Sequence, residues 1–278
     1  MGIEFTKMHG LGNDYHFIDC TKFPIDDPQA LSREMSHRHL GVGSDGIILV
    51  LPGDGDDFTM RIFNADGSEA ETCGNGIRCF AKYVFERKMT RKKEFVIQTV
   101  AGPNCVVLTT EGETVVSVRS NMGAPRFERS QIPMTGPEGR VIEEALQLDD
   151  QTVKVTCANI GNPHAVVFVE DATVIDLARV GPKIENHEKF PQRTNVEFVH
   201  IIDRDNMVMR IWERGSGITM ASGSGSCGSA LAAMITDRVN RRVNVHLVYG
   251  KLLIEWAEDG FVYQEGPATE VFTGIWSG

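Results

Sequence analysis

The chain repeats part of its own sequence, and this duplication limits the fold more than any other feature. Three pairs of short segments are separated by one constant offset of 149 residues, given by 161 − 12, 212 − 63 and 222 − 73. The pairs are Gly12-Asn13 with Gly161-Asn162, Phe63-Asn64 with Trp212-Glu213, and Cys73-Gly74-Asn75-Gly76 with Ser222-Gly223-Ser224-Gly225. A constant offset across three segments is typical of a duplicated domain, so we expect two similar halves.

Short β-rich runs dominate the rest of the chain. They predict strands at residues 58–63, 95–100, 115–118, 165–169, 196–202, 207–212, 243–248 and 252–256. Helices are predicted from Asp27 to about residue 40, from Asn75 to about residue 89 and from Ser224 to about residue 239. The last two helices are apolar over much of their surface, which favours burial of each one inside a curved sheet.

These patterns predict an α+β fold of two pseudo-symmetric domains, each a barrel-like, mainly antiparallel sheet around a central helix. We expect residues 1–121 with 268–278 to form the half that carries Cys73, and residues 122–267 to form the half that carries Ser222. The stretch 121–137 contains several Pro, Gly and Ser residues and is predicted to link the two halves.

Composition argues against several classes of protein. Of 278 residues, 41% are hydrophobic and 24% are charged, which is typical of a globular chain with a large core. A net charge of −10 and the lack of a long basic run argue against nucleic acid as a partner. The longest aliphatic run, residues 47–51, is far too short for a membrane helix, so no membrane partner is expected.

The cysteines indicate a reducing, cytoplasmic compartment. Six of them in 278 residues are too sparse for a disulfide scaffold, and no C-x-x-C pair suggests a structural zinc site, so no metal is expected. Cys20, Cys105 and Cys157 lie in strand-like runs, where a place in the core is expected. Cys79 is expected to pack within its helix.

The repeated Cys-Gly-x-Gly and Ser-Gly-x-Gly segments have a definite chemical capacity. Glycines let successive backbone N–H groups point the same way, and the helix that follows places its positive end there, so each loop is suited to bind a carboxylate. The same environment lowers the pKa of a thiol, which makes Cys73 a candidate acid–base group. Two such loops facing one carbon would place an acid–base group on each side of it, the geometry needed to invert a stereocentre.

Six segments in order resemble the diaminopimelate epimerases, which are cofactor-independent amino-acid epimerases. They are residues 8–14, 63–69, 73–79, 161–164, 193–198 and 212–215, and the likeness covers essentially the whole chain. The resemblance implies two barrel-like domains, no cofactor and a homodimer. It also implies interconversion of LL- and meso-diaminopimelate, a small-molecule amino acid, on the route to lysine and peptidoglycan.

The resemblance also assigns site residues, with Cys73 as one catalytic group. It places the proximal carboxylate of the substrate on the backbone N–H groups of Gly74, Asn75, Gly223 and Ser224. It places the distal amino-acid head among Asn64, Asn195, Glu213 and Arg214, with Asn13 and Asn162 lining the site. His164 is the histidine next to a motif, and a supporting role or a purely local hydrogen bond are both open for it.

Ser222 departs from the family pattern, because the family carries its second catalytic cysteine at this position. Cys227 lies five residues further on and cannot occupy the same backbone position. A serine hydroxyl is a far weaker acid than a thiol, so we expect Ser222 to be a poor base toward a Cα proton. A deliberate Cys-to-Ser change and natural divergence both explain the residue, and the otherwise complete site favours the first.

Other functions remain as alternatives. A histidine racemase, a proline-type racemase and an isomerase related to phenazine biosynthesis share the duplicated fold, and a non-catalytic amino-acid binding protein fits Ser222. Residues 41–46 match the G-x-G-x-x-G pattern of dinucleotide sites. That segment follows a helix-like stretch and precedes an aliphatic run, the reverse of the order that such a site needs.

Overall fold

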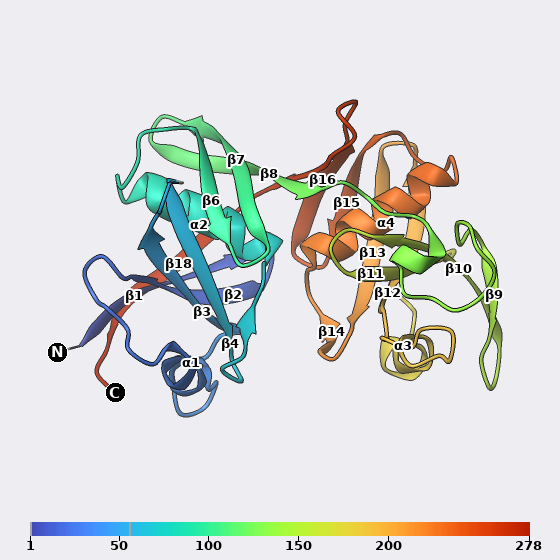
Figure 1. Ribbon diagram of the computed structural model, residues 1–278, viewed down its shortest axis with the longest axis horizontal. Helices are drawn as coiled ribbons and strands as arrows, with labels where there is room; N and C mark the ends of the chain where they lie inside the picture. Colours follow the sequence, from blue (N-terminus) through green and yellow to red (C-terminus); the bar gives the residue numbers. More distant parts are fainter. Residues whose placement is uncertain (1, 56) are drawn as a thin grey trace. The chain divides into compact units, whose positions relative to one another are not determined.

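The structure is a computed structural model that describes residues 2–55 and 57–278. It divides into two compact units, which Figure 1 shows with the chain coloured from blue to red. The first unit contains the residues up to Ser120 together with Gly266–Gly278, and the second contains Asn121–Glu265. The first and last strands of the chain pair with each other in the first unit, so both ends of the chain belong to it.

The first unit is a mainly antiparallel sheet with two helices, α1 (Pro28–Ser36) and α2 (Gly74–Glu86). Its strands are β1 (Ile3–Gly10), β2 (Asn13–Asp19), β3 (Gly46–Pro52), β4 (Phe58–Asn64), β5 (Glu69–Ala70), β6 (Glu94–Thr99), β7 (Gly102–Glu111), β8 (Thr114–Gly123) and β18 (Thr269–Trp276). Two pairs are parallel, β2 with β3 and β4 with β6. The pairs β18–β1, β1–β2, β3–β4, β4–β5, β6–β7 and β7–β8 are antiparallel.

The second unit repeats this arrangement with α3 (Leu177–Glu185) and α4 (Gly223–Ile235), preceded by the short 3-10 helix η1 (Arg129–Gln131). Its strands are β9 (Glu144–Gln147), β10 (Thr152–Asn159), β11 (Pro163–Phe168), β12 (Asn195–Asp203), β13 (Asn206–Glu213), β14 (Gly217–Thr219), β15 (Arg242–Leu247), β16 (Gly250–Trp256) and β17 (Val262–Gly266). The parallel pairs recur at the same places, β11 with β12 and β13 with β15.

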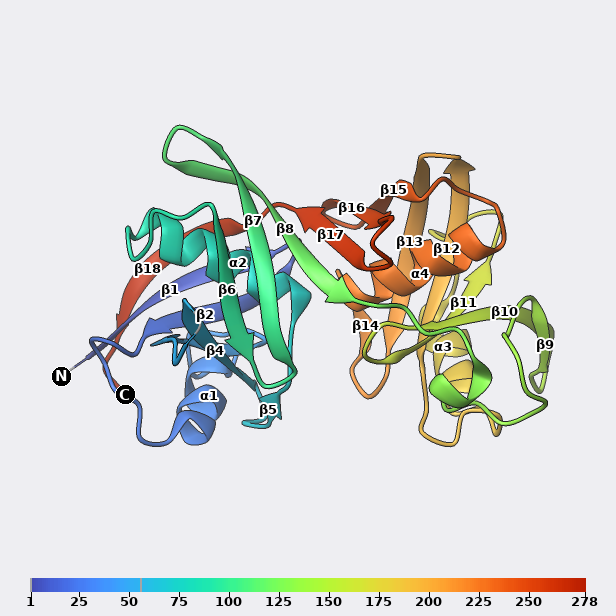
Figure 2. The ribbon, with the colours of Figure 1, turned by 45° about the horizontal axis from the view of Figure 1, so that its top comes forward.

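Each unit has a central helix with strands packed around it (Figure 2). Strands β1, β2 and β7 contact α2, and Phe80, Ala81 and Val84 of that helix are fully buried. Strands β10, β11, β12 and β16 contact α4, in which Ala230 and Leu231 are fully buried. Burial on several sides explains why both helices are apolar around much of their circumference.

The structure confirms the predicted fold class, the three predicted helices and the eight predicted strands, with shifts of a few residues at their ends. It also contains a helix that was not predicted, α3, which has Pro182 in its interior. Proline usually ends a helix, so the pattern alone argues against one here. The duplication nevertheless indicates it, because the N-cap residues Asp27 of α1 and Asp176 of α3 differ by the same 149 residues (176 − 27).

One expectation holds in part and another is wrong. The chain passes from the first unit to the second at Asn121, where the predicted linker 121–137 begins, but Ile132 and Met134 of that segment are buried in the core of the second unit. Cys105, expected in the core, is exposed on β7. Its neighbours Val106 and Leu108 are the residues of that strand that face the core, so alternation directs Cys105 outward. Cys20 is half-buried, whereas Cys79, Cys157 and Cys227 are buried.

In the described part of the chain, every helix is too short or too polar to cross a membrane.

Candidate functional site

The two repeated loops form matching helix starts, one in each unit. Cys73 is the N-cap of α2, with extended backbone angles (φ −149°, ψ 111°), and its Sγ accepts from the Gly76 N–H at 3.4 Å. Ser222 is the N-cap of α4 in the same conformation (φ −135°, ψ 123°), and its Oγ accepts from the Gly225 N–H at 3.2 Å. The first N–H groups of a helix have no intrahelical partner, so both loops are suited to hold an anion.

The second glycine of each loop, Gly76 or Gly225, allows a close approach to the strand behind it. A Cβ on Gly76 would lie 2.8 Å from the Ile48 side chain, and one on Gly225 would lie 2.5 Å from Ile211 and 3.2 Å from Glu197 Oε1. Ile48 and Glu197 are therefore at equivalent positions, consistent with the offset of 149 (197 − 48). The glycine pattern of the loops follows from this packing as well as from anion binding.

Cys73 is half-buried and lies among polar groups from β2. The Tyr15 hydroxyl donates to Cys73 Sγ at 3.5 Å, and the thiol donates to Asn13 Oδ1 at 3.4 Å. Asn13 follows a tight turn in which Gly12 has a φ of 98°, and the corresponding Gly161 before Asn162 has a φ of 100°. Tyr15 and the Gly76 N–H therefore both donate to the sulfur, and Asn13 accepts from it.

A buried arginine holds the first turn of α2. Arg78 is fully buried, and its guanidinium donates to Asn75 Oδ1 at 2.7 Å and to the Gly74 carbonyl at 3.2 Å. Asn75 Nδ2 in turn donates to Asn13 Oδ1 at 3.2 Å. These bonds fix the orientation of both amides beside Cys73.

A second polar layer holds Asn13. Its Nδ2 donates to Asp45 Oδ2 at 2.7 Å, and Arg38 donates to Asp45 at 2.9 Å and to Asp14 at 3.2 Å. Burial raises the pKa of Asp45 despite the hydrogen bond from Asn13. Burial acts in the same direction on Asp14, but Lys7 and Arg38 outweigh it and hold the pKa of Asp14 below its usual value. Fixed hydrogen bonds of this kind preorganise a site.

Ser222 has a carboxylate for a neighbour instead of a phenol. Its hydroxyl donates to Glu213 Oε2 at 3.2 Å, and Thr219 donates to the other oxygen, Glu213 Oε1. Glu213 ends β13, and Thr219 ends the short antiparallel strand β14 that pairs with it. Ser222 itself is buried, with 4% of its surface exposed.

A buried histidine and glutamate lie beneath the start of α4. His164 Nδ1 is 2.6 Å from Glu197 Oε1, and both side chains are completely buried. The other ring nitrogen, His164 Nε2, is 2.8 Å from Asn162 Oδ1. Burial raises the pKa of Glu197 although His164 opposes the shift. His164 therefore orients Asn162 and has no bond to Ser222 among the contacts of the described residues.

The residues expected at the distal head lie at strand ends. Asn195 begins β12 and is buried; its Nδ2 donates to the Pro163 carbonyl, and its Oδ1 accepts from the Arg214 N–H, both at 2.9 Å. The Arg214 guanidinium donates to the Gln192 carbonyl at 3.1 Å. In the first unit, Asn64 ends β4 and its Nδ2 donates to Ser68 Oγ at 3.0 Å. Asn195 thus holds the backbone of Arg214 in place.

Four functional neighbours were missed by the sequence analysis. They are Tyr15 beside Cys73, Asp45 behind Asn13, Glu197 beneath His164 and Thr219 beside Glu213. The duplication contains a signal for one of them, Tyr15. Tyr15 corresponds to His164 (164 − 15) and lies two residues after Asn13, as His164 does after Asn162.

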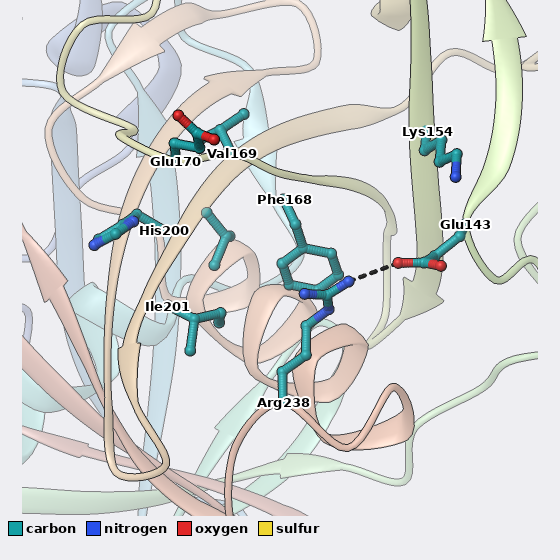
Figure 3. A pocket seen from close by; sticks show the side chains of 9 residues that line it. Glu143, Lys154, Phe168, Val169, Glu170, His200, Ile201 and Arg238 are labelled. Carbon is teal, nitrogen blue, oxygen red and sulfur yellow. Dashed lines mark hydrogen bonds and ion pairs between the residues drawn. The ribbon is translucent and has the colours of Figure 1, made fainter.

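A separate cavity in the second unit does not involve these residues (Figure 3). It has a volume of about 430 Å³ and is lined by Glu143, Lys154, Phe168, Val169, Glu170, Val199, His200, Ile201 and Arg238. Arg238 donates to Glu143 Oε1 at 2.6 Å and its guanidinium lies 4.3 Å from the centre of the Phe168 ring. The Arg238 guanidinium is thus already paired with Glu143 and stacked on Phe168, so the cavity is not assigned a ligand.

Residues 2–55 and 57–278 contain no group of three or more His, Cys, Asp and Glu side chains arranged to hold a metal ion.

The sequence matches a known family over most of its length. The model of the diaminopimelate epimerase family matches residues 5–128 and 156–271. A diaminopimelate epimerase of Moorella thermoacetica is 50% identical over 275 residues, which are 98% of each chain. One from Methanococcus maripaludis strain C6 is 47% identical over 273 residues, covering 98% of this chain and 99% of the relative.

Solved structures with lower sequence identity share the fold. A PhzF-family phenazine biosynthesis protein from Bacillus anthracis superposes with a TM-score of 0.69 over 99% of each chain, at 17% identity. A hydroxyproline epimerase from Agrobacterium vitis gives a TM-score of 0.66 at 13% identity, covering 99% of this chain and 90% of the other. At these identities the likeness concerns the fold alone.

Proposed function

The chain belongs to the diaminopimelate epimerase family, and we propose that it inverts the Cα of diaminopimelate by proton transfer on two faces, with Cys73 on one face. It is an isomerase of the epimerase type. The observation that carries the mechanism is the duplicated helix start, in which Cys73 and Ser222 are N-caps with the same geometry. We assign the enzyme to lysine and peptidoglycan precursor synthesis, in the cytoplasm and as a homodimer.

The proposed reaction needs no cofactor. The Cys73 thiolate removes the Cα proton, so that an S–H bond forms as the C–H bond breaks, and the carbanion receives a proton from a group on the opposite face. This requires the starts of α2 and α4 to face one Cα when substrate is bound. In the reverse direction the Cys73 thiol supplies the proton.

The α-carboxylate next to the reacting carbon is assigned to the N–H groups at the two helix starts. They belong to Gly74 and Asn75 in α2 and to Gly223 and Ser224 in α4. These donors and the positive helix ends stabilise the negative charge that the carboxylate shares with the carbanion. A Cβ on Gly223 would lie 2.7 Å from Gln264 Oε1, so this position accepts a side chain poorly.

The distal amino-acid head is assigned to Asn64, Asn195, Glu213 and Arg214. Arg214 offers a planar pair of donors to a carboxylate, Glu213 accepts from an ammonium group, and amides do both. Asn13 and Asn162 line the site, and His164 supports it by holding Asn162. A substrate with two amino-acid heads uses both sets of groups, which favours diaminopimelate over proline.

Ser222 is proposed to slow the reaction. Its hydroxyl occupies the N-cap position at which the family carries its second catalytic cysteine, and it donates to Glu213. A serine hydroxyl loses a proton far less readily than a thiol, so one face of Cα lacks an efficient base. The chain is therefore expected to bind diaminopimelate and to epimerise it slowly.

The test compares the chain with its Ser222→Cys variant in a coupled assay for meso-diaminopimelate. We expect turnover to rise by about 10²–10⁴-fold, the usual contribution of a positioned acid–base group. Ser229→Cys, which adds a thiol farther along α4, is the matched control and leaves turnover unchanged. Equal turnover of the parent chain and the Ser222→Cys variant would reject the proposed role of Ser222.

Exchange in heavy water tests the other face. With one thiol, the Cα proton is expected to exchange faster from one stereoisomer than from the other, and Cys73→Ala removes the faster exchange. Equal exchange rates from both stereoisomers would contradict a one-thiol site. A thermal-shift comparison of diaminopimelate, histidine and proline separates this function from a histidine racemase, because a diaminopimelate site ranks diaminopimelate first. The Ser222→Cys variant separates it from an amino-acid binding protein, which gains no turnover from the change.

A further inference from the structure

Tyr15 brings a phenol from the core of the first unit to the sulfur of Cys73. Its ring packs in the same core cluster as Phe17, Ile48 and Ile77, and only 5% of its surface is exposed. Its hydroxyl lies at the edge of that cluster, 3.5 Å from Cys73 Sγ. A buried ring on a strand offers few alternative positions to the hydroxyl, so the contact is held by packing.

The hydroxyl acts as a donor in this contact. Burial raises the pKa of Tyr15 well above its usual value, and a negative charge on Cys73 raises it further. Tyr15 is therefore protonated across the range in which a thiol titrates. A neutral O–H group that faces a sulfur favours the thiolate over the thiol, because the hydrogen bond to the charged acceptor is stronger.

Two other contacts of the sulfur have opposite effects on the protonation of Cys73. The Gly76 N–H also donates to Sγ and favours the thiolate, whereas Asn13 Oδ1 accepts from the thiol and favours the protonated form. Asn13 is fixed by Asp45, so it cannot readily turn its amide nitrogen toward the sulfur. Tyr15 adds a side-chain donor to this balance, and its hydroxyl favours the thiolate.

We propose that Tyr15 is a positioning residue whose hydroxyl sets the thiolate fraction of Cys73 and so adjusts this thiol between its roles as base and acid. The catalytic consequence rests on the proposed function, but the effect on the sulfur does not. This contact is not repeated among the described residues of the second unit, because the residue equivalent to Tyr15, His164, forms hydrogen bonds with Glu197 and Asn162.

The test measures the sulfur directly. The rate of Cys73 alkylation by iodoacetamide is followed against pH, with each cysteine read separately by peptide mass spectrometry. In Tyr15→Phe, the midpoint of the Cys73 profile is expected to move upward by about one pH unit, the effect of losing one hydrogen bond to a charged group. The exposed Cys105 in the same unit serves as an internal reference and keeps its profile.

Tyr83→Phe is the matched control. Tyr83 is a buried tyrosine of the same core cluster, stacked on Phe17, and its removal leaves the Cys73 profile in place. An unchanged Cys73 midpoint in a folded Tyr15→Phe protein, or an equal shift in Tyr83→Phe, overturns the proposal. Far-ultraviolet circular dichroism and thermal melting establish that each variant is folded.

Replacing the tyrosines by 3-fluorotyrosine gives a second, opposite perturbation that preserves packing. The fluorinated phenol is a stronger donor, so the Cys73 midpoint is expected to move downward, and the same labelling of Tyr15→Phe has no effect. A downward shift that persists without Tyr15 overturns the proposal. Alkylation shifts without any epimerase activity in the Ser222→Cys variant would reject the proposed function and leave the role of Tyr15 intact.

Discussion

The starts of α2 and α4 have the same backbone and different side-chain chemistry. Cys73 and Ser222 both cap a helix of 13 residues by accepting a backbone N–H three positions ahead. Beyond the cap the two units diverge, because a phenol and an amide contact the sulfur, whereas a carboxylate contacts the hydroxyl. The duplicated backbone is suited to holding a carboxylate, and the neighbours that govern proton transfer differ from one unit to the other.

The difference extends one layer deeper. Behind Gly76 the first unit places the apolar Ile48, and behind Gly225 the second unit places Glu197, which pairs with His164. The loop of the first unit therefore rests on an apolar side chain, whereas that of the second rests on Ile211 and also on a buried polar pair. A buried pair is stable only while both members are present, so the second unit is expected to be more sensitive to single substitutions.

Glu197→Ile, which copies the residue of the first unit, is expected to have the largest effect on stability. It leaves His164 Nδ1 buried without its partner, and we expect the free energy of unfolding to fall by about 3 kcal/mol. Chemical denaturation in urea at pH 7 measures the change.

The double variant His164→Phe with Glu197→Ile sharpens the comparison. It replaces the pair by apolar groups of similar size, and is expected to cost about 1 kcal/mol, less than Glu197→Ile alone. The loss in the free energy of unfolding is also measured for Glu197→Ile and His164→Phe alone. A loss in the double variant equal to the sum of these two losses would show that the pair is not coupled.

The duplication made most of the fold predictable. It placed both central helices and the two capping residues, because a repeated backbone repeats its turns and caps. It also places α3, where the N-cap Asp176 follows Asp27 by the same offset, although Pro182 argues against a helix when the segment is read alone.

The side-chain environment of the site was less predictable. Motifs identified Cys73 and Ser222, but Tyr15 reaches the sulfur from a strand 58 residues away in sequence, and only the fold brings them together. Cys105 shows the same limit on a smaller scale. A shift of one residue along a strand moves a side chain from the core face to the outer face, and composition does not determine which face it takes.

A second prediction concerns the buried histidine of the first unit. His16 is fully buried, its Nε2 has no hydrogen-bond partner among the described residues, and the equivalent residue of the second unit is Ala165 (165 − 16). Burial, together with the charge of Lys7, lowers the pKa of His16 from 6.5 to about 4. The unfolded chain therefore binds this proton more readily than the folded protein between these two values.

His16 does not lower the free energy of unfolding above pH 6.5, where it is neutral in both states. The free energy of unfolding decreases as the pH falls from 6.5 toward 4, because the unfolded chain then binds the proton. From pH 7 to pH 5 we expect a loss of about 2 kcal/mol in the free energy of unfolding that His16→Asn does not show. Urea denaturation at both pH values measures it, and His39→Asn, at an exposed histidine, is the matched control. The same pH dependence in His16→Asn and in the parent chain would exclude His16 as its source.

The smallest predicted effect compares the two caps themselves. A hydroxyl oxygen accepts a hydrogen bond better than a thiol sulfur does, and both caps are formed, Ser222 Oγ with the Gly225 N–H and Cys73 Sγ with the Gly76 N–H. Ser222→Ala is therefore expected to lower the free energy of unfolding by about 1 kcal/mol, and Cys73→Ala by about half as much or less. Thermal and urea denaturation of the two variants measure the difference.

The aspartate caps calibrate this comparison. Asp27 accepts from the Ala30 N–H at 2.9 Å and Asp176 from the Arg179 N–H at 3.2 Å, so Asp27→Ala and Asp176→Ala report what a carboxylate cap contributes in each unit. If Cys73→Ala costs as much as Ser222→Ala, the sulfur stabilises its helix as well as the hydroxyl does. Ser222 would then have no structural advantage over cysteine, and its effect on the protein would lie entirely in the chemistry of proton transfer.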